Sequence, residues 1–245
     1  MPATTDPSPP PGDHSPEQRP TTAARPARLT PAFALVAVAA GAGCPLAMQF
    51  DRSLSAYFRQ LDLPGDLQKA ISLSEAFAHG FGVLFILLSV FVVGVQRRRA
   101  VWIAILITAL SGLTANALKA TVVRVRPHAD GLLVIGHEES SRDAAEVVER
   151  SFWDARQRSF PSGHAATAWG LAIGLSLVFT RGWWIFAILA VLASLQRIES
   201  GAHYPSDVLA GMAIAFLVAA CVLASSSVRR QVRAVHELNT PSIRA

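Results

Sequence analysis

Charged residues are scarce in this sequence. Asp, Glu, Lys and Arg make up only 16% of the 245 residues, while hydrophobic residues make up 51%. Soluble domains carry roughly 25% charged residues, so the composition argues against an ordinary soluble protein. The net charge is +5, but the basic residues form short clusters between apolar runs and do not form one stripe. This pattern disfavours nucleic-acid binding and indicates a membrane protein.

Cysteine is also rare, because the chain has only Cys44 and Cys221. Both lie in apolar runs, and the topology predicted below puts Cys44 near the outer end of the first helix and Cys221 in the inner half of the last. A disulfide needs close alpha carbons, so we expect none between them. The sequence has no Cys/His spacing typical of a metal site. We therefore predict no metal and no cofactor.

Proline is concentrated at the start, where residues 1–30 hold eight of the fifteen prolines. This stretch has too few apolar residues to bury a core, so we predict a disordered tail. Beyond it lie six apolar runs, at about 31–50, 74–95, 101–118, 163–180, 183–196 and 206–226. A spanning helix needs about 20 residues. The runs show no period-2 alternation of the kind that would indicate strands. We predict an all-α, six-helix transmembrane bundle over residues 31–228, followed by a basic C-terminal tail at 229–245.

The placement of Lys and Arg sets the expected orientation. With both termini in the cytoplasm, the short inner turns at 97–99 and 181 are almost purely basic, whereas the outer loops mix basic with acidic residues. Trp102, Trp183 and Trp184 lie beside the inner turns, where aromatic anchors are common. We expect a protein of a bacterial inner membrane, with cytoplasmic N- and C-termini. The sequence gives no indication of an oligomeric state.

Three polar clusters flank the apolar runs, and charged residues near lipid are costly enough to mark functional sites. The clusters are Lys119, Arg124 and Arg126-Pro127; Phe160-Pro161-Ser162-Gly163-His164; and Arg197, His203 and Asp207. An even number of spans separates them, so all three face the same side of the membrane. In the expected orientation this is the outer face.

The chemistry of these clusters suits a phosphate. Three cations, a hydroxyl and a helix N-terminus that opens at Gly163 offer many donors to an oxyanion. His203 and Asp207 are spaced i, i+4, and a carboxylate on one imidazole nitrogen fixes the tautomer and leaves the other nitrogen free to attack. His164 is then available as the acid for the leaving oxygen.

The three clusters resemble the signature of the type 2 phosphatidic acid phosphatase (PAP2) superfamily, K-x6-R-P, P-S-G-H and S-R-x5-H-x3-D. Lys119 to Arg126-Pro127 matches the first part, Pro161 to His164 the second, and Arg197 to Asp207 the third. Gln196 departs from the pattern, because the family usually has Ser there. The resemblance covers roughly residues 70–225, including the plan of six helices.

This resemblance implies a role for each matched residue. His203 is the nucleophile and forms a phosphohistidine, Asp207 orients it, and His164 protonates the leaving group. The ligands of the phosphoryl oxygens are Lys119, Arg126, Ser162, Gly163 and Arg197, and Arg124 often accompanies the motif. The fixed cations take the place of a metal, so the resemblance implies a metal-independent phosphatase.

The expected substrate is a phosphorylated lipid, since the site lies at the membrane. Undecaprenyl diphosphate is our first choice, and phosphatidic acid, phosphatidylglycerol phosphate and lipid A 1-phosphate also fit. One alternative is a phosphotransferase that passes phosphate from the same histidine to a second lipid. Another is a non-enzymatic anion-binding protein such as a transporter, but pure binding needs no oriented nucleophile.

Two further features have open interpretations. Glu75 and His79 lie one turn apart at the start of the second apolar run. They are either ordinary interfacial residues or part of the lining of a substrate entrance. We predict that the segment 141–150 forms a surface helix that covers the site.

Overall fold

The computed structural model describes residues 25–128 and 158–239. The helices are α1 (Arg25–Gln60), α2 (Gly65–Leu73), α3 (Gly80–Val93), α4 (Arg98–Lys119), α6 (Gly163–Val178), α7 (Trp183–Glu199), α8 (Pro205–Ala224) and α9 (Ser226–Asn239). The short 3-10 turns η2 (Ser74–Phe77), η3 (Val95–Arg97) and η5 (Thr180–Gly182) connect some of them. Within these two ranges the only β pairing is an isolated bridge between Arg124 and Arg158. The predicted all-α class is confirmed.

Several helices are long and apolar enough to cross a membrane. Among the described residues these are Leu29–Gln60 of α1, then α4, Thr180–Glu199 with α7, and α8. Gly65–Phe77 and Gly80–Val93 qualify only together, as a pair bent by 71°, and α6 is a shorter apolar helix of 16 residues. The chain is therefore an integral membrane protein. Its six predicted runs correspond to four long helices, one bent pair and one short helix.

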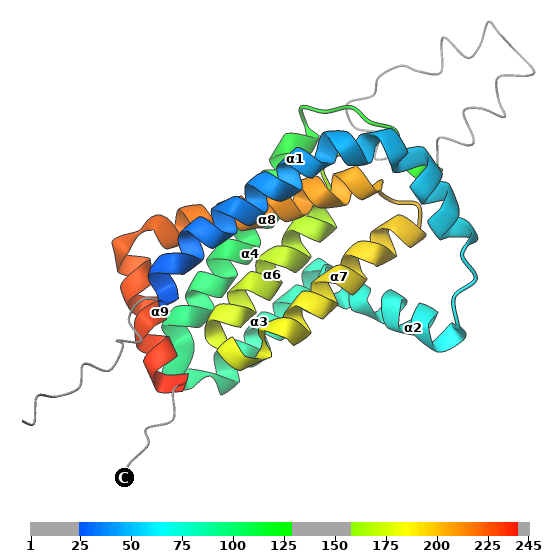
Figure 1. Ribbon diagram of the computed structural model, residues 1–245. Helices are drawn as coiled ribbons and strands as arrows, with labels where there is room; N and C mark the ends of the chain where they lie inside the picture. Colours follow the sequence, from blue (N-terminus) through cyan, green and yellow to red (C-terminus); the bar gives the residue numbers. More distant parts are fainter. Residues whose placement is uncertain (1–24, 129–157, 240–245) are drawn as a thin grey trace, which may run out of the picture.

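The short helix α6 lies at the centre of the bundle. It packs against α4, α7 and α8, while α1 runs along the outside of α8 (Figure 1). Most α6 side chains are buried, as expected of a helix that is apolar on all sides. The approach to α4 is close, because a Cβ added at Gly174 would lie 2.7 Å from the Cα of Ala104. Gly170 likewise faces Ser111 and Thr108, as small residues do where membrane helices pack closely.

The second predicted run is broken where a single helix was expected. Residues 74–77 form η2, and α3 begins only at Gly80. A Cβ at Gly82 would lie 1.9 Å from the carbonyl oxygen of Ala76, so the turn requires glycine. The break directs α2 away from the axis of α3 (Figure 1). It also places Glu75 beside α7, which η2 contacts.

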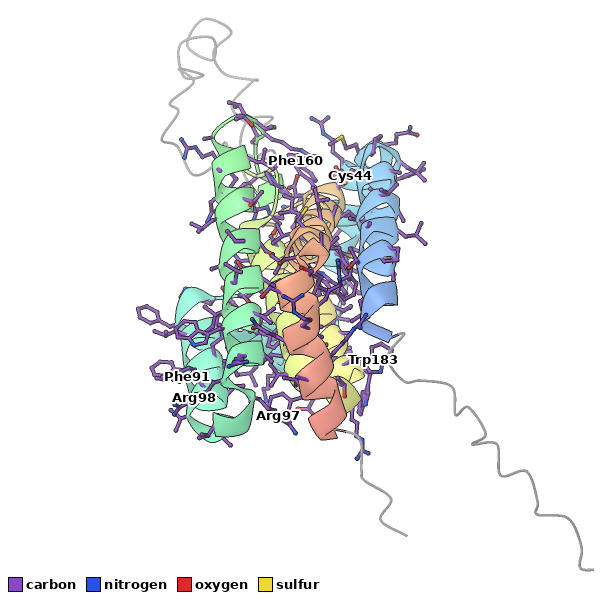
Figure 2. All side chains as sticks on the ribbon, turned by 90° about the vertical axis from the view of Figure 1, so that its left-hand side faces the viewer. Cys44, Phe91, Arg97, Arg98, Phe160 and Trp183 are labelled. Carbon is purple, nitrogen blue, oxygen red and sulfur yellow. The ribbon has the colours of Figure 1, made fainter. Side chains whose placement is uncertain are left out.

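The two ends of the bundle differ in character. Figure 2 shows Arg97, Arg98 and Trp183 at the end opposite Phe160, which precedes α6. The start of α1 and the helix α9 lie together (Figure 1), at the end where Figure 2 shows Arg97. The basic turns and the motif-bearing loops thus occupy opposite ends, as the expected topology requires.

Both predicted tails are partly helical. Residues 1–24 and 240–245 lie outside the described residues, but residues 25–30 form the start of α1. Residues 226–239 form α9, which overlaps the predicted basic tail and buries Val232 and Val235 against the bundle. Both cysteines are free, Cys44 being buried and Cys221 exposed.

The close contact between α4 and α6 gives a first prediction. We expect Gly174→Val to destabilise the protein by about 1–3 kcal/mol, because the added methyl groups have no space beside Ala104. Thermal unfolding in detergent should show a loss of about 2–4 °C for each kcal/mol. The control is Gly41→Ala on α1, where a Cβ meets nothing within 4 Å. Equal unfolding temperatures for Gly174→Val and the wild type would contradict this account of the packing.

Candidate active site

The first turn of α8 is built around the carboxylate of Asp207. Pro205 opens the helix, where its missing N–H is not needed. The backbone N–H of Tyr204 donates to Asp207 Oδ2 over 2.8 Å, as in a capping box. Ser159 Oγ also donates to Oδ2, and Arg124 Nη1 donates to Oδ1 over 2.5 Å. These donors offset the cost of burying a carboxylate that is fully shielded from solvent.

His203 lies directly against this carboxylate. Its Nδ1 is 3.6 Å from Asp207 Oδ2, slightly longer than a hydrogen bond, and has no other hydrogen-bond partner in the described part of the chain. The backbone N–H of His203 donates to the carbonyl oxygen of Arg197 over 3.0 Å. A carboxylate can only accept, so this contact favours the tautomer that carries its proton on Nδ1. The other nitrogen, Nε2, is then free of a proton.

The charge state of His203 follows from its surroundings. Burial lowers the pKa of His203, and the charges of Lys119 and Arg126 lower it further against the opposing effect of Asp207. The imidazole is therefore neutral at neutral pH, which is the form that a nucleophile requires.

The N-terminus of α6 is hydrogen-bonded to the turn that carries Asp207. Ser162 caps α6, and its Oγ accepts from the N–H of Ala165 over 3.3 Å. The N–H of Ser162 donates to the carbonyl oxygen of Asp207 over 2.9 Å. A Cβ at Gly211 would lie 2.4 Å from the carbonyl oxygen of Ser162, so α8 and this loop are in tight contact. The free amides of α6 are thus held beside His203.

Cations gather around this helix N-terminus. A Cβ at Gly163 would lie 3.6 Å from Lys119 Nζ and 3.0 Å from Asn116 Oδ1. Lys119 is in electrostatic range of three further cations, Arg126, Arg158 and Arg197. Burial and then the charge of Arg197 lower the pKa of Arg126, although Asp207 opposes them. Mutual repulsion of this kind is relieved when an anion binds among the cations.

Arg197 has two contacts that the sequence did not indicate. Its Nη2 donates to Glu75 Oε1 over 2.8 Å, and its Nε donates to Gln196 Oε1 over 2.5 Å. Glu75 comes from η2, so the break between α2 and α3 contributes to the site. Gln196, the departure from the family pattern, holds the guanidinium by a side chain that a Ser could not match in length. The ring centroid of His79 lies 6.3 Å from that of His164.

The structure brings the eight predicted site residues to one end of the bundle. These are Lys119, Arg126, Ser162, Gly163, His164, Arg197, His203 and Asp207. His164 is in electrostatic range of Arg197, His203 and Lys119. Among the described residues, no group of three or more His, Cys, Asp or Glu side chains could hold a metal ion. The segment predicted to cover the site, 141–150, lies outside the described residues.

Two carboxylate contacts of Arg124 were not foreseen. Its guanidinium joins Asp207 to Asp51 of α1, with 2.5 Å from Nη2 to Asp51 Oδ2. Burial alone would lower the pKa of Arg124, but these two carboxylates outweigh burial and raise it. The first predicted apolar run ended at about residue 50, so Asp51 fell outside the predicted helix. The sequence did contain one signal, because Asp51 and Ser55 are polar residues one helical turn apart, on one face of a helix. In the structure both are buried.

Comparison with known proteins tests the family assignment. The model of the PAP2 superfamily matches residues 100–231, which is more than half of the chain. The chain belongs to the PAP2 superfamily. The matched region contains all three signature clusters, from Lys119 to Asp207.

The individual relatives are named phosphatases. The chain is 37% identical over 103 residues to a lipid A 1-phosphatase of Rhizobium johnstonii, covering 42% of this chain and 38% of that protein. It is 30% identical to a decaprenylphosphoryl-5-phosphoribose phosphatase of Mycobacterium tuberculosis, covering 71% of this chain and 88% of that protein. The first match therefore spans only about two fifths of the relative's length.

The fold agrees as well. A transmembrane PAP2-type phosphatidylglycerolphosphate phosphatase from Bacillus subtilis superposes with a TM-score of 0.53 at 19% identity, covering 90% of this chain and all of that chain. At this identity the superposition supports the fold alone.

The space between Gly163 and Lys119 gives a second prediction. We expect Gly163→Ala to weaken the binding of orthovanadate, a phosphate analogue, about tenfold or about 1.4 kcal/mol. The reason is that the methyl group would occupy the gap in front of Asn116 and Lys119. Titration calorimetry in detergent measures the affinity. Gly80→Ala, where a Cβ meets nothing within 4 Å, should bind like the wild type. Undiminished affinity of Gly163→Ala would place the anion elsewhere.

Proposed function

We propose that this PAP2 protein is a metal-independent lipid phosphatase that works through a phosphohistidine on His203. One observation carries the proposal: a buried imidazole, backed by the carboxylate of Asp207, lies beside a helix N-terminus and a group of cations. A binding protein needs the cations and the helix N-terminus. Only covalent chemistry needs the oriented imidazole.

The first step transfers the phosphoryl group to the protein. Nε2 of His203 attacks phosphorus, the bond between phosphorus and the leaving oxygen breaks, and His164 gives its proton to that oxygen. Lys119, Arg126 and Arg197 bind the phosphoryl oxygens together with the hydroxyl of Ser162 and the amide of Gly163. Because these donors are fixed in place before the reaction, they stabilise the charge that spreads over the oxygens in the transition state.

The second step returns the protein to its starting state. Water attacks the phosphohistidine, the bond between phosphorus and Nε2 breaks, and inorganic phosphate leaves. His164, now neutral, accepts the proton from the water. Asp207 stabilises the positive charge on the imidazole ring in both steps. With a diphosphate substrate the leaving group of the first step is a lipid monophosphate.

The substrate class is a phosphorylated lipid. The location of the site at the end of a membrane bundle supports this class, as do the names of the relatives. Lipid A 1-phosphate gains support from the first relative, and a polyprenyl carrier such as undecaprenyl diphosphate from the second. The expected location remains a bacterial inner membrane, with the site on the outer face and the termini in the cytoplasm.

The decisive test is phosphate release in detergent with EDTA present. We expect the wild type to release phosphate from at least one of lipid A 1-phosphate, undecaprenyl diphosphate and phosphatidic acid, and His203→Ala to lose at least about 10³-fold in rate, as nucleophile variants do. Acid-labile ³²P on the wild-type chain would identify the phosphohistidine.

Other outcomes of this test separate the alternatives. Phosphate transfer that appears only when an acceptor lipid is added would indicate the phosphotransferase. Vanadate binding without any turnover of the lipids would indicate an anion-binding protein and would exclude the proposal.

The protonation of His203 gives a pH dependence. Because burial and nearby cations lower the pKa of His203, the neutral form persists as the pH falls below the ordinary histidine value of about 6.5. We expect activity to survive at that pH and to fall only at lower pH, as His203 becomes protonated. The measurement is kcat/KM between pH 4 and 9 with two lipids whose phosphates titrate differently. An acid limb above about pH 6.5 with both lipids would contradict the assigned charge state.

A further inference from the structure

The helix α1 carries one buried carboxylate at the level of the site. Asp51 is only 2% exposed. Its Oδ1 accepts from the backbone N–H of Ser206 over 3.0 Å, and its Oδ2 accepts from Ser206 Oγ over 2.5 Å. Ser206 is the second residue of α8, where an amide has no partner within the helix. Asp51 therefore caps α8 from a different helix, one residue before Asp207.

Asp51 is also joined to Asp207 through Arg124. The guanidinium donates from Nη2 to Asp51 and from Nη1 to Asp207, with 2.5 Å in each case. Nη1 also contacts Ser206 Oγ at 2.7 Å, and the guanidinium lies 4.4 Å from the centroid of the Tyr204 ring. The result is a continuous chain of ion pairs from α1 to the carboxylate that faces His203.

The balance of charge in this chain bears on His203. A guanidinium paired with Asp207 alone would give a neutral pair, which stabilises a positive imidazole poorly. With Asp51 included, the three groups carry a net charge of about −1. The site is shielded from solvent at both carboxylates, so a single charge has a larger effect there than in water.

We propose that Asp51 is a positioning residue, which acts through Arg124 to orient Asp207 and to keep its negative charge effective on His203. This inference rests on the proposed function for its effect on turnover. The effect on the imidazole itself does not depend on turnover. Among the described residues, the hydrogen bonds and the ion pair of Asp51 go to Ser206 and Arg124, so Asp51 acts through Arg124 and is not a catalytic residue.

The experiment compares Asp51→Asn, Arg124→Gln and the double variant. Asparagine keeps the shape and one acceptor oxygen for the backbone N–H of Ser206, but it removes the charge and the acceptor that faces Arg124. The control is Asp62→Asn, which removes an exposed carboxylate from the segment after α1. Thermal unfolding in detergent confirms that each variant is folded before kinetics are compared.

We expect kcat to depend on the net charge of Asp51, Arg124 and Asp207. Asp51→Asn should lower kcat by about 10–100-fold, by analogy with the loss of a residue that orients a metal-bound histidine, with KM within about twofold because the phosphate ligands are untouched. Arg124→Gln leaves two buried carboxylates facing each other and should be less active still. The double variant returns to a net charge of −1 and should exceed Arg124→Gln in kcat. A double variant no better than Arg124→Gln would overturn the proposal.

A second readout is independent of turnover. The groups that act on the His203 ring are Lys119, Arg126, Asp207 and His164, and none of them is altered. NMR titration of the ¹⁵N-labelled histidines should give a lower pKa for His203 in Asp51→Asn and the wild-type value in Asp62→Asn. If the wild type hydrolyses no lipid but this shift appears, the proposed function fails and the role of Asp51 stands. If the wild type is active and Asp51→Asn changes neither kcat nor the titration, the role of Asp51 fails alone.

Discussion

The buried carboxylate of Asp207 is the point on which the site depends. An ion removed from solvent must be surrounded by donors, and here the donors come from three separate parts of the chain, with a fourth part behind one of them. Ser159 belongs to the loop before α6, Tyr204 to the turn before α8, and Arg124 to the segment after α4, while Asp51 of α1 supports Arg124. Satisfying one side chain therefore fixes the relative positions of the elements that carry the signature. The same requirement explains how residues more than 80 positions apart in sequence, such as Arg124 and Asp207, meet in one place.

The membrane determines where such a site can be built. Helices that cross lipid must satisfy their own backbone, so unpaired amides and carbonyls occur mainly at helix ends. The site uses those ends: the last residue of α4, the first turns of α6 and α8, and the end of α7. Small residues make this possible, since Gly174 and Gly211 allow α6 to approach α4 and α8 closely. The close packing of the bundle thus sets the spacing of the groups at its end.

Much of this arrangement could be predicted from sequence. The spacing of the three clusters and the parity of the apolar runs were enough to bring Lys119, Ser162 and His203 to one end. Hydropathy failed where a helix continues beyond its apolar part, as α1 does through Asp51 to Gln60. It also failed at η2, where the bend depends on contacts of Gly82 with the backbone of Ala76, and at α9, whose few apolar residues become buried only against other helices. Each of these depends on tertiary contacts, which a single-sequence pattern does not contain.

The proposed phosphate site must also fold when no phosphate is bound. Lys119, Arg126, Arg158 and Arg197 repel one another, so some of that charge has to be offset by the protein itself. Asp207 does so across the site, and Glu75 does so directly, through its contact of 2.8 Å with Arg197. The Glu75 side chain is 39% exposed, whereas that of Asp207 is fully buried. A partly exposed carboxylate can be exchanged for a phosphate oxygen at little cost, because water solvates it after it leaves. A buried carboxylate cannot be exchanged in this way. In the proposed mechanism Glu75 is therefore the counter-ion that a phosphate oxygen replaces, and Asp207 is the one that stays in place.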